Sequence, residues 1–364
     1  MKPFGEIGAA VVGTGFIGVV HVEALRRLGV QVHGVVGSSH ERAQARSREL
    51  NLPPAYESFE AMLADDRVDV VHVTSPNHLH HHHATAALRA GKHVVCEKPL
   101  AMSSSESADL LQTADRSGLV HAVNFNLRFY PICQHVHGLI RDREIGDVRL
   151  ISGHYLQDWL LLDTDWNWRL EPELGGGLRA VADIGSHWMD LTSYLCGRRI
   201  TEVIAGLATF ITRRRDREMT TDDAATIMLR YEGDARGAFT VSQVSAGRKN
   251  SLAYEIDGAT SSVAWNSERP DELFIGHRGR PSEVLLRDPA ILNDEGRRAT
   301  WLPGGHAEGF GDTFKALYAA VYAAVAQGKP GAGYPTFADG HDSMLVCDAV
   351  ARSSRERRWI EVKR

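Results

Sequence analysis

The sequence predicts an α/β domain followed by an α+β domain, and three observations carry that prediction. A glycine-rich turn lies between a strand-like and a helix-like segment near the N-terminus, strands then alternate with helices to about residue 123, and several strands with little helix between them follow from about residue 202 to residue 286. Alternating strands and helices imply right-handed crossovers and a mostly parallel sheet, whereas successive strands imply an antiparallel sheet. We expect a Rossmann dinucleotide-binding domain over residues 1–127 and a second domain over residues 128–364, whose last helices are candidates for packing back on the first.

Hydrophobic periodicity places the individual elements. In the first domain the expected strands cover residues 7–12, 30–36, 68–74, 93–96 and 119–123, and the expected helices 21–28, 41–50, 84–90 and 104–117. In the second domain the expected strands cover residues 148–156, 203–211, 224–231, 235–244, 252–256, 262–265, 272–275 and 359–362, and the expected helices 184–195, 310–326 and 338–352.

Composition excludes several classes of protein. The 364 residues are 43% hydrophobic and 24% charged, with a net charge of −5 that offers no basic field for nucleic acid. No apolar run approaches the roughly 20 residues that cross a bilayer, and the first residues lack the order of a signal peptide. Four widely spaced cysteines form no C-x-x-C pair, so neither a zinc site nor a disulfide framework is indicated. We therefore expect a cytoplasmic protein with no nucleic-acid or membrane partner.

The glycine-rich turn has the spacing of a dinucleotide-binding fingerprint. Gly13 would permit a tight turn, Gly15 would let a pyrophosphate approach the backbone, and Gly18 would allow close packing of helix on strand. The helix that starts at Phe16 and Ile17 would direct its unpaired N–H groups and its dipole at the phosphates. We therefore expect a nicotinamide dinucleotide at these five residues.

The choice between NAD and NADP is less clear from the end of the second strand. An acidic residue there would bind the adenosine ribose of NAD, but the sequence has Gly37-Ser38-Ser39, with Arg42 one turn along. The serines could bind the ribose hydroxyls of NAD, and Ser38, Ser39 and Arg42 together could equally hold the extra phosphate of NADP. We favour NAD and keep NADP as the alternative.

Two further motifs stand in a fixed order after this fingerprint. Glu97-Lys98-Pro99 follows the expected strand 93–96, and Asp183-x-x-x-His187 opens the expected helix 184–195. Together with the segments 74–78, 90–93 and 335–340, this order resembles the glucose–fructose oxidoreductase/inositol dehydrogenase/rhizopine catabolism (Gfo/Idh/MocA) family over nearly the whole chain. The resemblance implies a second domain built on a large open antiparallel sheet, dimers or tetramers formed through that sheet, and oxidation or reduction of sugars and cyclitols.

Oxidising a secondary alcohol requires a base near neutral pH and a group that steadies the developing alkoxide. Lys98 and His187 are suitable types, because a lysine near other cations or buried can have a lowered pKa and histidine titrates near pH 7. Asp183 lies four residues before His187, so both would face one side of a helix. By resemblance, Lys98 and His187 act on the reacting hydroxyl and Asp183 orients it or balances the lysine's charge. Which residue is the base stays open; we favour His187.

The remaining expected site residues come from the resemblance and from neighbouring positions. The cofactor is expected to contact, besides the fingerprint and the serine segment, residues Ser75, Asn77, His80, Glu97, Lys98, Asn126, Trp168 and Arg169. The substrate is expected to contact Lys98, Arg128, Tyr155, Gln157, Arg179, Asp183, His187 and His306, with Arg179 as a candidate for an anionic group. Four consecutive histidines, residues 80–83, point in different directions on a helix and predict no metal site. The basic run 213–217 predicts a solvated hairpin tip.

The sequence thus favours an enzyme that transfers hydride between NAD(P) and a ring hydroxyl of a sugar, glycoside or cyclitol. The alternative is an NAD-dependent glycoside hydrolase that oxidises C3 transiently, eliminates the aglycone and adds water, with an acidic glycoside as a possible substrate. A non-catalytic nucleotide sensor is a third class, and the presence of Lys98, Asp183 and His187 together argues against it.

Overall fold

The computed structural model describes residues 2–364, which form two compact units. The first comprises Met1–Asn126 and Gly311–Met344, and the second Leu127–Phe310 and Leu345–Arg364. Residues 311–344, which the sequence division assigned to the second domain, thus belong to the first unit. The physical reason is helix α10 (Phe310–Gln327), because the aromatic rings of Phe314 and Tyr318 pack against the buried His21.

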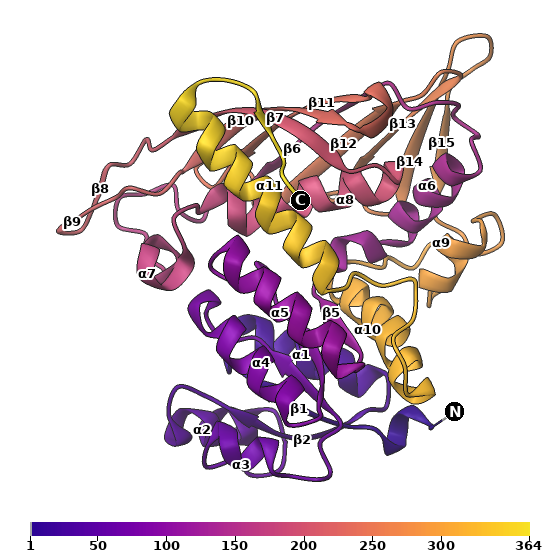
Figure 1. Ribbon diagram of the computed structural model, residues 1–364. Coiled ribbons are helices and arrows are strands. Elements are labelled where there is room, and N and C mark those ends of the chain that lie inside the picture. Colours follow the sequence, from indigo (N-terminus) through magenta and orange to yellow (C-terminus); the bar gives the residue numbers. More distant parts are fainter. Residues whose placement is uncertain (1) are drawn as a thin grey trace. The chain divides into compact units, whose positions relative to one another are not determined.

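The first unit is built on a five-stranded parallel sheet (Figure 1). The strands are β1 (Gly8–Val12), β2 (Gln31–Val36), β3 (Val70–Val73), β4 (His93–Cys96) and β5 (His121–Val123), in the order β2-β1-β3-β4-β5. The helices are α1 (Phe16–Arg27), α2 (His40–Glu49), α3 (Phe59–Leu63), α4 (His80–Arg89), α5 (Ser104–Ser117), most of α10, and the start of α11 (Phe337–Glu356). The predicted Rossmann sheet is confirmed.

Local sequence explains where several of these helices begin. Ser39, Ser58 and Ser103 precede α2, α3 and α5, and each hydroxyl accepts a hydrogen bond from a backbone N–H of the first turn. Such N-caps satisfy N–H groups that have no partner within the helix.

The second unit is built on a nine-stranded sheet in which only the pair β6–β11 is parallel. Its order is β15-β14-β13-β12-β6-β11-β10-β7-β16. The strands are β6 (Leu150–Leu156), β7 (Ile200–Ala208), β10 (Ala224–Tyr231), β11 (Arg236–Ser242), β12 (Ser251–Asp257), β13 (Ser261–Asn266), β14 (Glu272–His277), β15 (Glu283–Leu286) and β16 (Ile360–Glu361). A two-stranded ribbon, β8 (Arg213–Arg214) and β9 (Arg217–Glu218), stands apart from it. The large, mostly antiparallel sheet agrees with the prediction.

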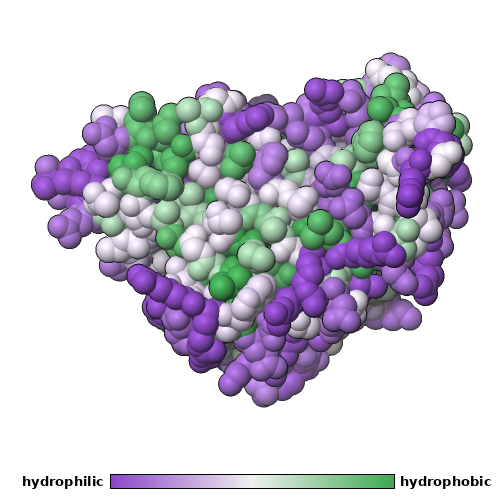
Figure 2. All heavy atoms as spheres, turned by 90° about the horizontal axis from the view of Figure 1, so that it is seen from above, coloured by the Kyte–Doolittle hydropathy of each residue, from purple (hydrophilic) through white to green (hydrophobic). Residues whose placement is uncertain are grey.

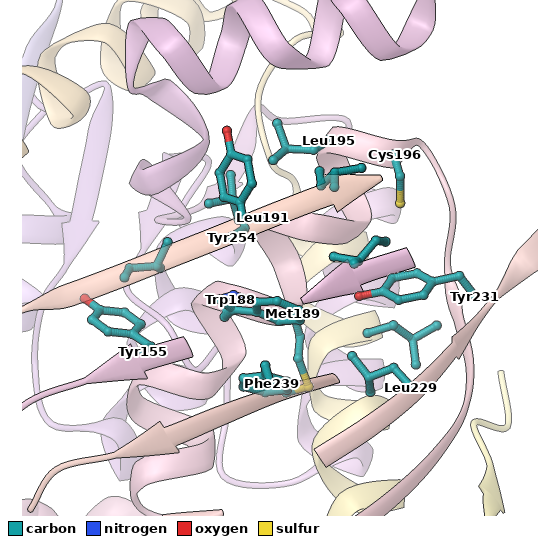
Figure 3. Packing of buried hydrophobic residues seen from close by; sticks show 14 of the residues in the cluster. Tyr155, Trp188, Met189, Leu191, Leu195, Cys196, Leu229, Tyr231, Phe239 and Tyr254 are labelled. Carbon is teal, nitrogen blue, oxygen red and sulfur yellow. The ribbon is translucent and has the colours of Figure 1, made fainter. Parts of the chain in front are cut away.

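Helices α6 (Pro131–Arg141), α8 (Ser186–Cys196) and the end of α11 lie along one face of this sheet (Figure 1). Helix α9 (Asp294–Ala299) packs against α6, and the short helix α7 (Pro172–Gly175) lies apart from the sheet. In the core between α8 and the strands, the Trp188 indole stacks on the Phe239 ring with centroids 4.3 Å apart (Figure 3). The indole also approaches β6 closely, since a Cβ on Gly153 would lie 2.7 Å from the Trp188 Nε1. Glycine at this position therefore lets α8 settle on the sheet.

The opposite face of the sheet carries exposed apolar side chains. Ala225 and Ile227 of β10 are buried, whereas Thr226 and Met228 between them are exposed, as expected for a strand with one covered face. Other large apolar side chains of the unit are also exposed, namely Phe210, Phe274, Val284 and Leu286. Figure 2, which views the molecule from above, shows apolar surface gathered in patches among hydrophilic residues.

Candidate active site

The glycine fingerprint occupies the turn between β1 and α1, with one steric role for each glycine. Gly13 has φ +116°, and a Cβ there would lie 2.5 Å from the Thr74 backbone. A Cβ on Gly18 would lie 2.2 Å from the Gly13 carbonyl oxygen. A Cβ on Gly15 would meet nothing within 4 Å, so this glycine borders open space. Two glycines are needed by the fold itself, and the third leaves room for a ligand.

The first turn of α1 faces that space with its backbone. Gly15 is the N-cap residue and has no side chain that could cap the helix. The Phe16 side chain is 76% exposed, and the following Ile17 is partly exposed. N–H groups at a helix start, next to a glycine with open space beside it, fit a pyrophosphate. These residues therefore fit a dinucleotide cofactor.

The segment after β2 presents polar side chains at the surface. Ser38, Ser39 and Arg42 are exposed. The Ser39 hydroxyl oxygen accepts a hydrogen bond from the Arg42 backbone N–H at 3.3 Å, so Ser39 is also the N-cap of α2. Their placement is compatible with binding the adenosine ribose or a phosphate attached to it.

The ends of β3 and β4 are tied together by a buried histidine. His80 makes contacts of 2.8 Å to the Ser75 carbonyl oxygen through Nε2 and 2.7 Å to the Pro99 carbonyl oxygen through Nδ1. Burial lowers the pKa of His80 despite these carbonyls. Asn77 is also buried, and the Ser75 hydroxyl lies 2.9 Å from the His83 Nδ1. The structure thus uses His80 to hold two loops, rather than exposing it to a ligand.

Lys98 follows β4, the fourth strand of the sheet along the chain. Its side chain is partly exposed, whereas Glu97 before it is 6% exposed. The Glu97 Oε2 accepts a hydrogen bond from the Lys98 backbone N–H at 3.2 Å, and Oε1 lies 3.0 Å from the His21 Nε2. The Lys98–Pro99 peptide is cis. Glu97 therefore fixes the backbone that carries the lysine.

Asn126, the last residue of the first segment of the first unit, is buried. Its side-chain N–H₂ donates to the Thr313 hydroxyl of α10 at 2.7 Å. This hydrogen bond links the Asn126 side chain to α10 within the first unit.

Asp183 and His187 lie in the second unit on one continuous helical segment. A π-helical turn, Val181–Gly185, precedes α8, so the helix expected at 184–195 begins earlier and with a wider first turn. Such turns are rare and often occur at functional sites. The Asp183 carboxylate accepts hydrogen bonds from the Arg169 Nε at 3.2 Å and from the Gln243 Nε2 at 2.8 Å. His187 is 8% exposed.

Tyr155 lies beside His187 and belongs to a second polar group. The ring centroids of Tyr155 and His187 are 6.4 Å apart. The Tyr155 hydroxyl and the Gln157 side-chain N–H₂ both donate to the Asn250 Oδ1, at 2.8 and 2.7 Å. Burial raises the pKa of the Tyr155 hydroxyl, so this group stays protonated and donates.

Trp168 and Arg169 form a stacked pair beside Asp183. The Arg169 guanidinium lies 4.4 Å from the Trp168 ring centroid, and both side chains are partly exposed. The pair brings a cation to the carboxylate of Asp183.

The structure corrects the expected role of Arg179 and shows the contacts of Arg128 and His306. Arg179 is 2% exposed and its guanidinium is ion-paired with Asp223, so it is a buried structural residue rather than a binder of substrate anions. The Arg128 guanidinium is ion-paired with Asp190 of the same unit. The exposed His306 directs Nδ1 at the Gly304 carbonyl oxygen of its own loop, at 3.3 Å.

The basic run 213–217 also differs from its prediction in one residue. The run does form a hairpin, but Arg214 within it is fully buried and donates to the Leu160 carbonyl oxygen at 2.5 Å. A count of charges along the chain could not reveal this, because Arg214 and its partner Leu160 are 54 residues apart in the sequence.

Sequence reasoning missed Gln243 and Asn250. Gln243 directly follows β11 and Asn250 directly precedes β12. An amide residue at a strand end has no distinguishing sequence pattern, so only the contacts with Asp183 and Tyr155 identify these two.

Comparison with known proteins bears on this site. Residues 7–125 match the family model described as "Oxidoreductase family, NAD-binding Rossmann fold" of the GFO/IDH/MocA proteins. Residues 133–264 match the model of the "GFO/IDH/MocA C-terminal domain". The chain belongs to the GFO/IDH/MocA family. It is therefore an NAD-binding oxidoreductase, which confirms the dinucleotide expected from the glycine fingerprint and the activity expected from the family resemblance.

Individual GFO/IDH/MocA proteins resemble the chain over its whole length. The levoglucosan dehydrogenase of Pseudarthrobacter phenanthrenivorans is 29% identical, with 98% of each chain covered. The structure of a levoglucosan dehydrogenase with NADH and levoglucosan superposes with a TM-score of 0.92 at 28% identity, over 98% of this chain and 100% of the other. The oxidoreductase domain protein from Kribbella flavida gives a TM-score of 0.92 at 31% identity, over 99% of this chain and 100% of the other.

Within residues 2–364 no group of three or more histidine, cysteine or acidic side chains is arranged to hold a metal ion. In the described part of the chain, no helix is both long enough and apolar enough to cross a bilayer.

Proposed function

We propose that this GFO/IDH/MocA protein oxidises a ring hydroxyl of an anhydrosugar or a related pyranose, with NAD as the hydride acceptor. The observation that carries the proposal is the full-length similarity to levoglucosan dehydrogenase, a protein named for an anhydrosugar. Lys98, Asp183 and His187 are present in the order along the chain that the family resemblance leads us to expect, and their side-chain types suit such chemistry.

The first unit carries the proposed cofactor-binding residues. NAD, when bound, accepts the hydride that leaves the carbinol carbon. Gly15 leaves open space for the pyrophosphate, and the first N–H groups of α1 neutralise its charge. Ser38 and Ser39 are the proposed ligands of the adenosine ribose, and because Arg42 is exposed next to them, NADP is the alternative cofactor.

The second unit supplies the proton acceptor. His187 takes the hydroxyl proton as hydride leaves, and Asp183 provides a negative charge that steadies the resulting imidazolium or the lysine. The Lys98 ammonium stabilises the developing alkoxide. Tyr155 and Gln157, both anchored on Asn250, are proposed to contact the sugar's other hydroxyls.

We also propose that the chain forms dimers or tetramers and acts in the cytoplasm. A groove of about 460 Å³ on the sheet of the second unit is lined by small and apolar residues of β7, β10 and β11, including Gly206 and Ala208, and by Phe210 directly after β7. Exposed apolar surface of this kind supports association through the sheet. The four cysteines are unpaired and buried, which supports a reducing compartment. Size-exclusion chromatography with light scattering tests the subunit number, and a Phe210→Asp variant should yield smaller particles.

A substrate panel tests the proposed function. Anhydrosugars, free pyranoses, inositols and neutral and acidic nitrophenyl glycosides are each mixed with NAD or NADP. Absorbance of reduced nicotinamide and release of nitrophenol are followed in the same wells. Stoichiometric cofactor reduction by an anhydrosugar or pyranose supports the proposal. Nitrophenol release without net reduction would contradict it and indicate a redox-assisted glycoside hydrolase.

A substitution tests the role of Lys98 within this function. Lys98→Ala should lower kcat by at least about 100-fold, the usual contribution of such a group, while NADH affinity stays within twofold. Lys329→Ala, which removes an exposed lysine after α10, serves as the control. Unchanged turnover in Lys98→Ala would remove this residue from the chemistry.

A further inference from the structure

Asp183 is held by a chain of buried polar groups that the sequence did not reveal. Its Oδ2 accepts a hydrogen bond of 2.8 Å from the Gln243 side-chain N–H₂. On the other side of that amide, the Gln243 Oε1 accepts from the Arg179 Nη1 at 3.4 Å. Arg179 in turn forms an ion pair with Asp223. Gln243 is 0% exposed, so no water competes for its amide.

The chemistry of these groups fixes which way the Gln243 amide points. A guanidinium has only donors, so the amide oxygen must face Arg179. The amide N–H₂ is then directed at Asp183, whose carboxylate has only acceptors when it is ionised. The buried cation thus sets the orientation of Gln243, and Gln243 in turn favours the charged form of Asp183.

The position of the Gln243 backbone is fixed by Asp223, the same residue that forms the ion pair with Arg179. The Gln243 backbone N–H donates to the Asp223 carbonyl oxygen at 3.0 Å. The Asp223 carboxylate also accepts from the Ile211 backbone N–H at 2.8 Å and lies 3.5 Å from the Arg214 guanidinium. Asp223 therefore holds the Gln243 backbone directly and the Gln243 side chain through Arg179.

The same cluster holds the start of the helix that carries Asp183. Asp222 accepts hydrogen bonds from the backbone N–H groups of Arg179 at 2.6 Å and Val181 at 2.8 Å. Asp222 thus binds the backbone at the start of the π-helical turn, and the adjacent Asp223 binds the Arg179 side chain.

We propose that Gln243 is a positioning residue that orients Asp183 and keeps it ionised during turnover, with Arg179 and Asp223 as its buried anchor. The proposal rests on the proposed function, because it assigns Asp183 to the reacting centre. Arg179 serves the reaction from beneath the site and does not contact the substrate.

Two substitutions separate this role from a merely structural one. Gln243→Met removes the donor to Asp183 with little change in side-chain length. Gln243→Glu keeps an oxygen opposite Arg179 but replaces the donor by a second negative charge. Asp183 is easier to protonate in both, and protonated Asp183 cannot steady the His187 imidazolium. The acid limb of the kcat/KM profile, set by His187 in the parent, should therefore gain the Asp183 ionisation and fall more steeply, and more so for Gln243→Glu than for Gln243→Met. Gln112→Met on α5, an exposed glutamine paired with Arg116, is the control and should leave the profile unchanged.

The outcomes distinguish failure of this inference from failure of the proposed function. Cofactor affinity, measured by NADH fluorescence, should stay within twofold in both variants, and thermal unfolding establishes that each is folded. If the parent oxidises no sugar of the panel, the proposed function fails. If the parent is active and either folded variant keeps the parent's acid limb, the positioning role of Gln243 is overturned. If Gln243→Met does not fold, Gln243→Glu decides, because it retains the contact with the anchor.

Discussion

Two glycine substitutions in the fingerprint should separate the needs of the fold from those of the cofactor. At Gly15 the backbone has φ −73° and ψ −175°, which any residue adopts, and a Cβ would meet nothing within 4 Å. Gly15→Ala should therefore leave the stability of the cofactor-free protein unchanged or raise it by about 0.4–1 kcal/mol, because alanine restricts the unfolded chain. The added methyl fills space that the pyrophosphate needs, so NADH affinity should fall at least tenfold, or about 1.4 kcal/mol.

Gly18 should behave differently because its neighbours are backbone atoms. A Cβ there would lie 2.2 Å from the Gly13 carbonyl oxygen, about 1.2 Å short of the 3.4 Å at which ordinary contact begins. Neither backbone can rotate away as a side chain could, so Gly18→Ala should cost about 1–3 kcal/mol. That cost corresponds to a melting temperature lower by about 2–4 °C per kcal/mol. NADH affinity should fall as well, since the turn that carries Gly15 is displaced.

The assay combines thermal unfolding of the cofactor-free protein with NADH titration by fluorescence. Gly279→Ala is the matched control, because its Cβ also meets nothing within 4 Å and the residue is exposed between β14 and β15. The control should match the parent in both measurements. If Gly15→Ala binds NADH as tightly as the parent, the pyrophosphate does not lie against this turn and the reasoning is refuted.

Three further predictions concern buried ionisable groups. Asp223→Asn leaves the buried Arg179 without its counter-ion and should lower the free energy of unfolding by about 3–5 kcal/mol in urea denaturation; a change below 1 kcal/mol would contradict this. Burial raises the pKa of Asp222 from 3.8 to about 6, so protonated Asp222 stabilises the fold below about pH 4, and this contribution of about 3 kcal/mol is lost as the pH rises to 6. The stability advantage of the parent over Asp222→Asn should therefore shrink between pH 4 and pH 6. A difference that stays constant over this range would contradict the prediction. Burial holds the pKa of His72 well below 6.5, so the stability it contributes is present above pH 6.5 and is lost as pH falls; His72→Gln should flatten the acid side of the stability curve, and an unchanged slope would exclude this role.

The sequence was informative where structure depends on local patterns. Glycine spacing, serine caps and the alternation of strands with helices are read from neighbouring residues, and the Rossmann sheet and the antiparallel sheet agree with them. The motif residues Lys98, Asp183 and His187 were found because their order resembles that of a known family.

The parts that were missed depend on contacts between residues far apart in the chain. Arg179 and its partner Asp223 are 44 residues apart, and Gln243 and Asp183 are 60 apart. An arginine near a proposed site looks the same in sequence whether it faces substrate or a buried carboxylate. The sequence did name the last helices as candidates for packing on the first domain, but the aromatic contacts of α10 that place Gly311–Met344 in the first unit are not revealed by periodicity alone.

Tracing deuterium tests the central claim most directly. An active sugar from the panel, carrying deuterium on its ring carbons, is incubated with unlabelled NAD and the protein, and both products are resolved by mass spectrometry. The account predicts one deuterium in each reduced nicotinamide and a matching amount of oxidised sugar. Reduced nicotinamide without deuterium, or a converted sugar that keeps all its label while NAD stays oxidised, would contradict it.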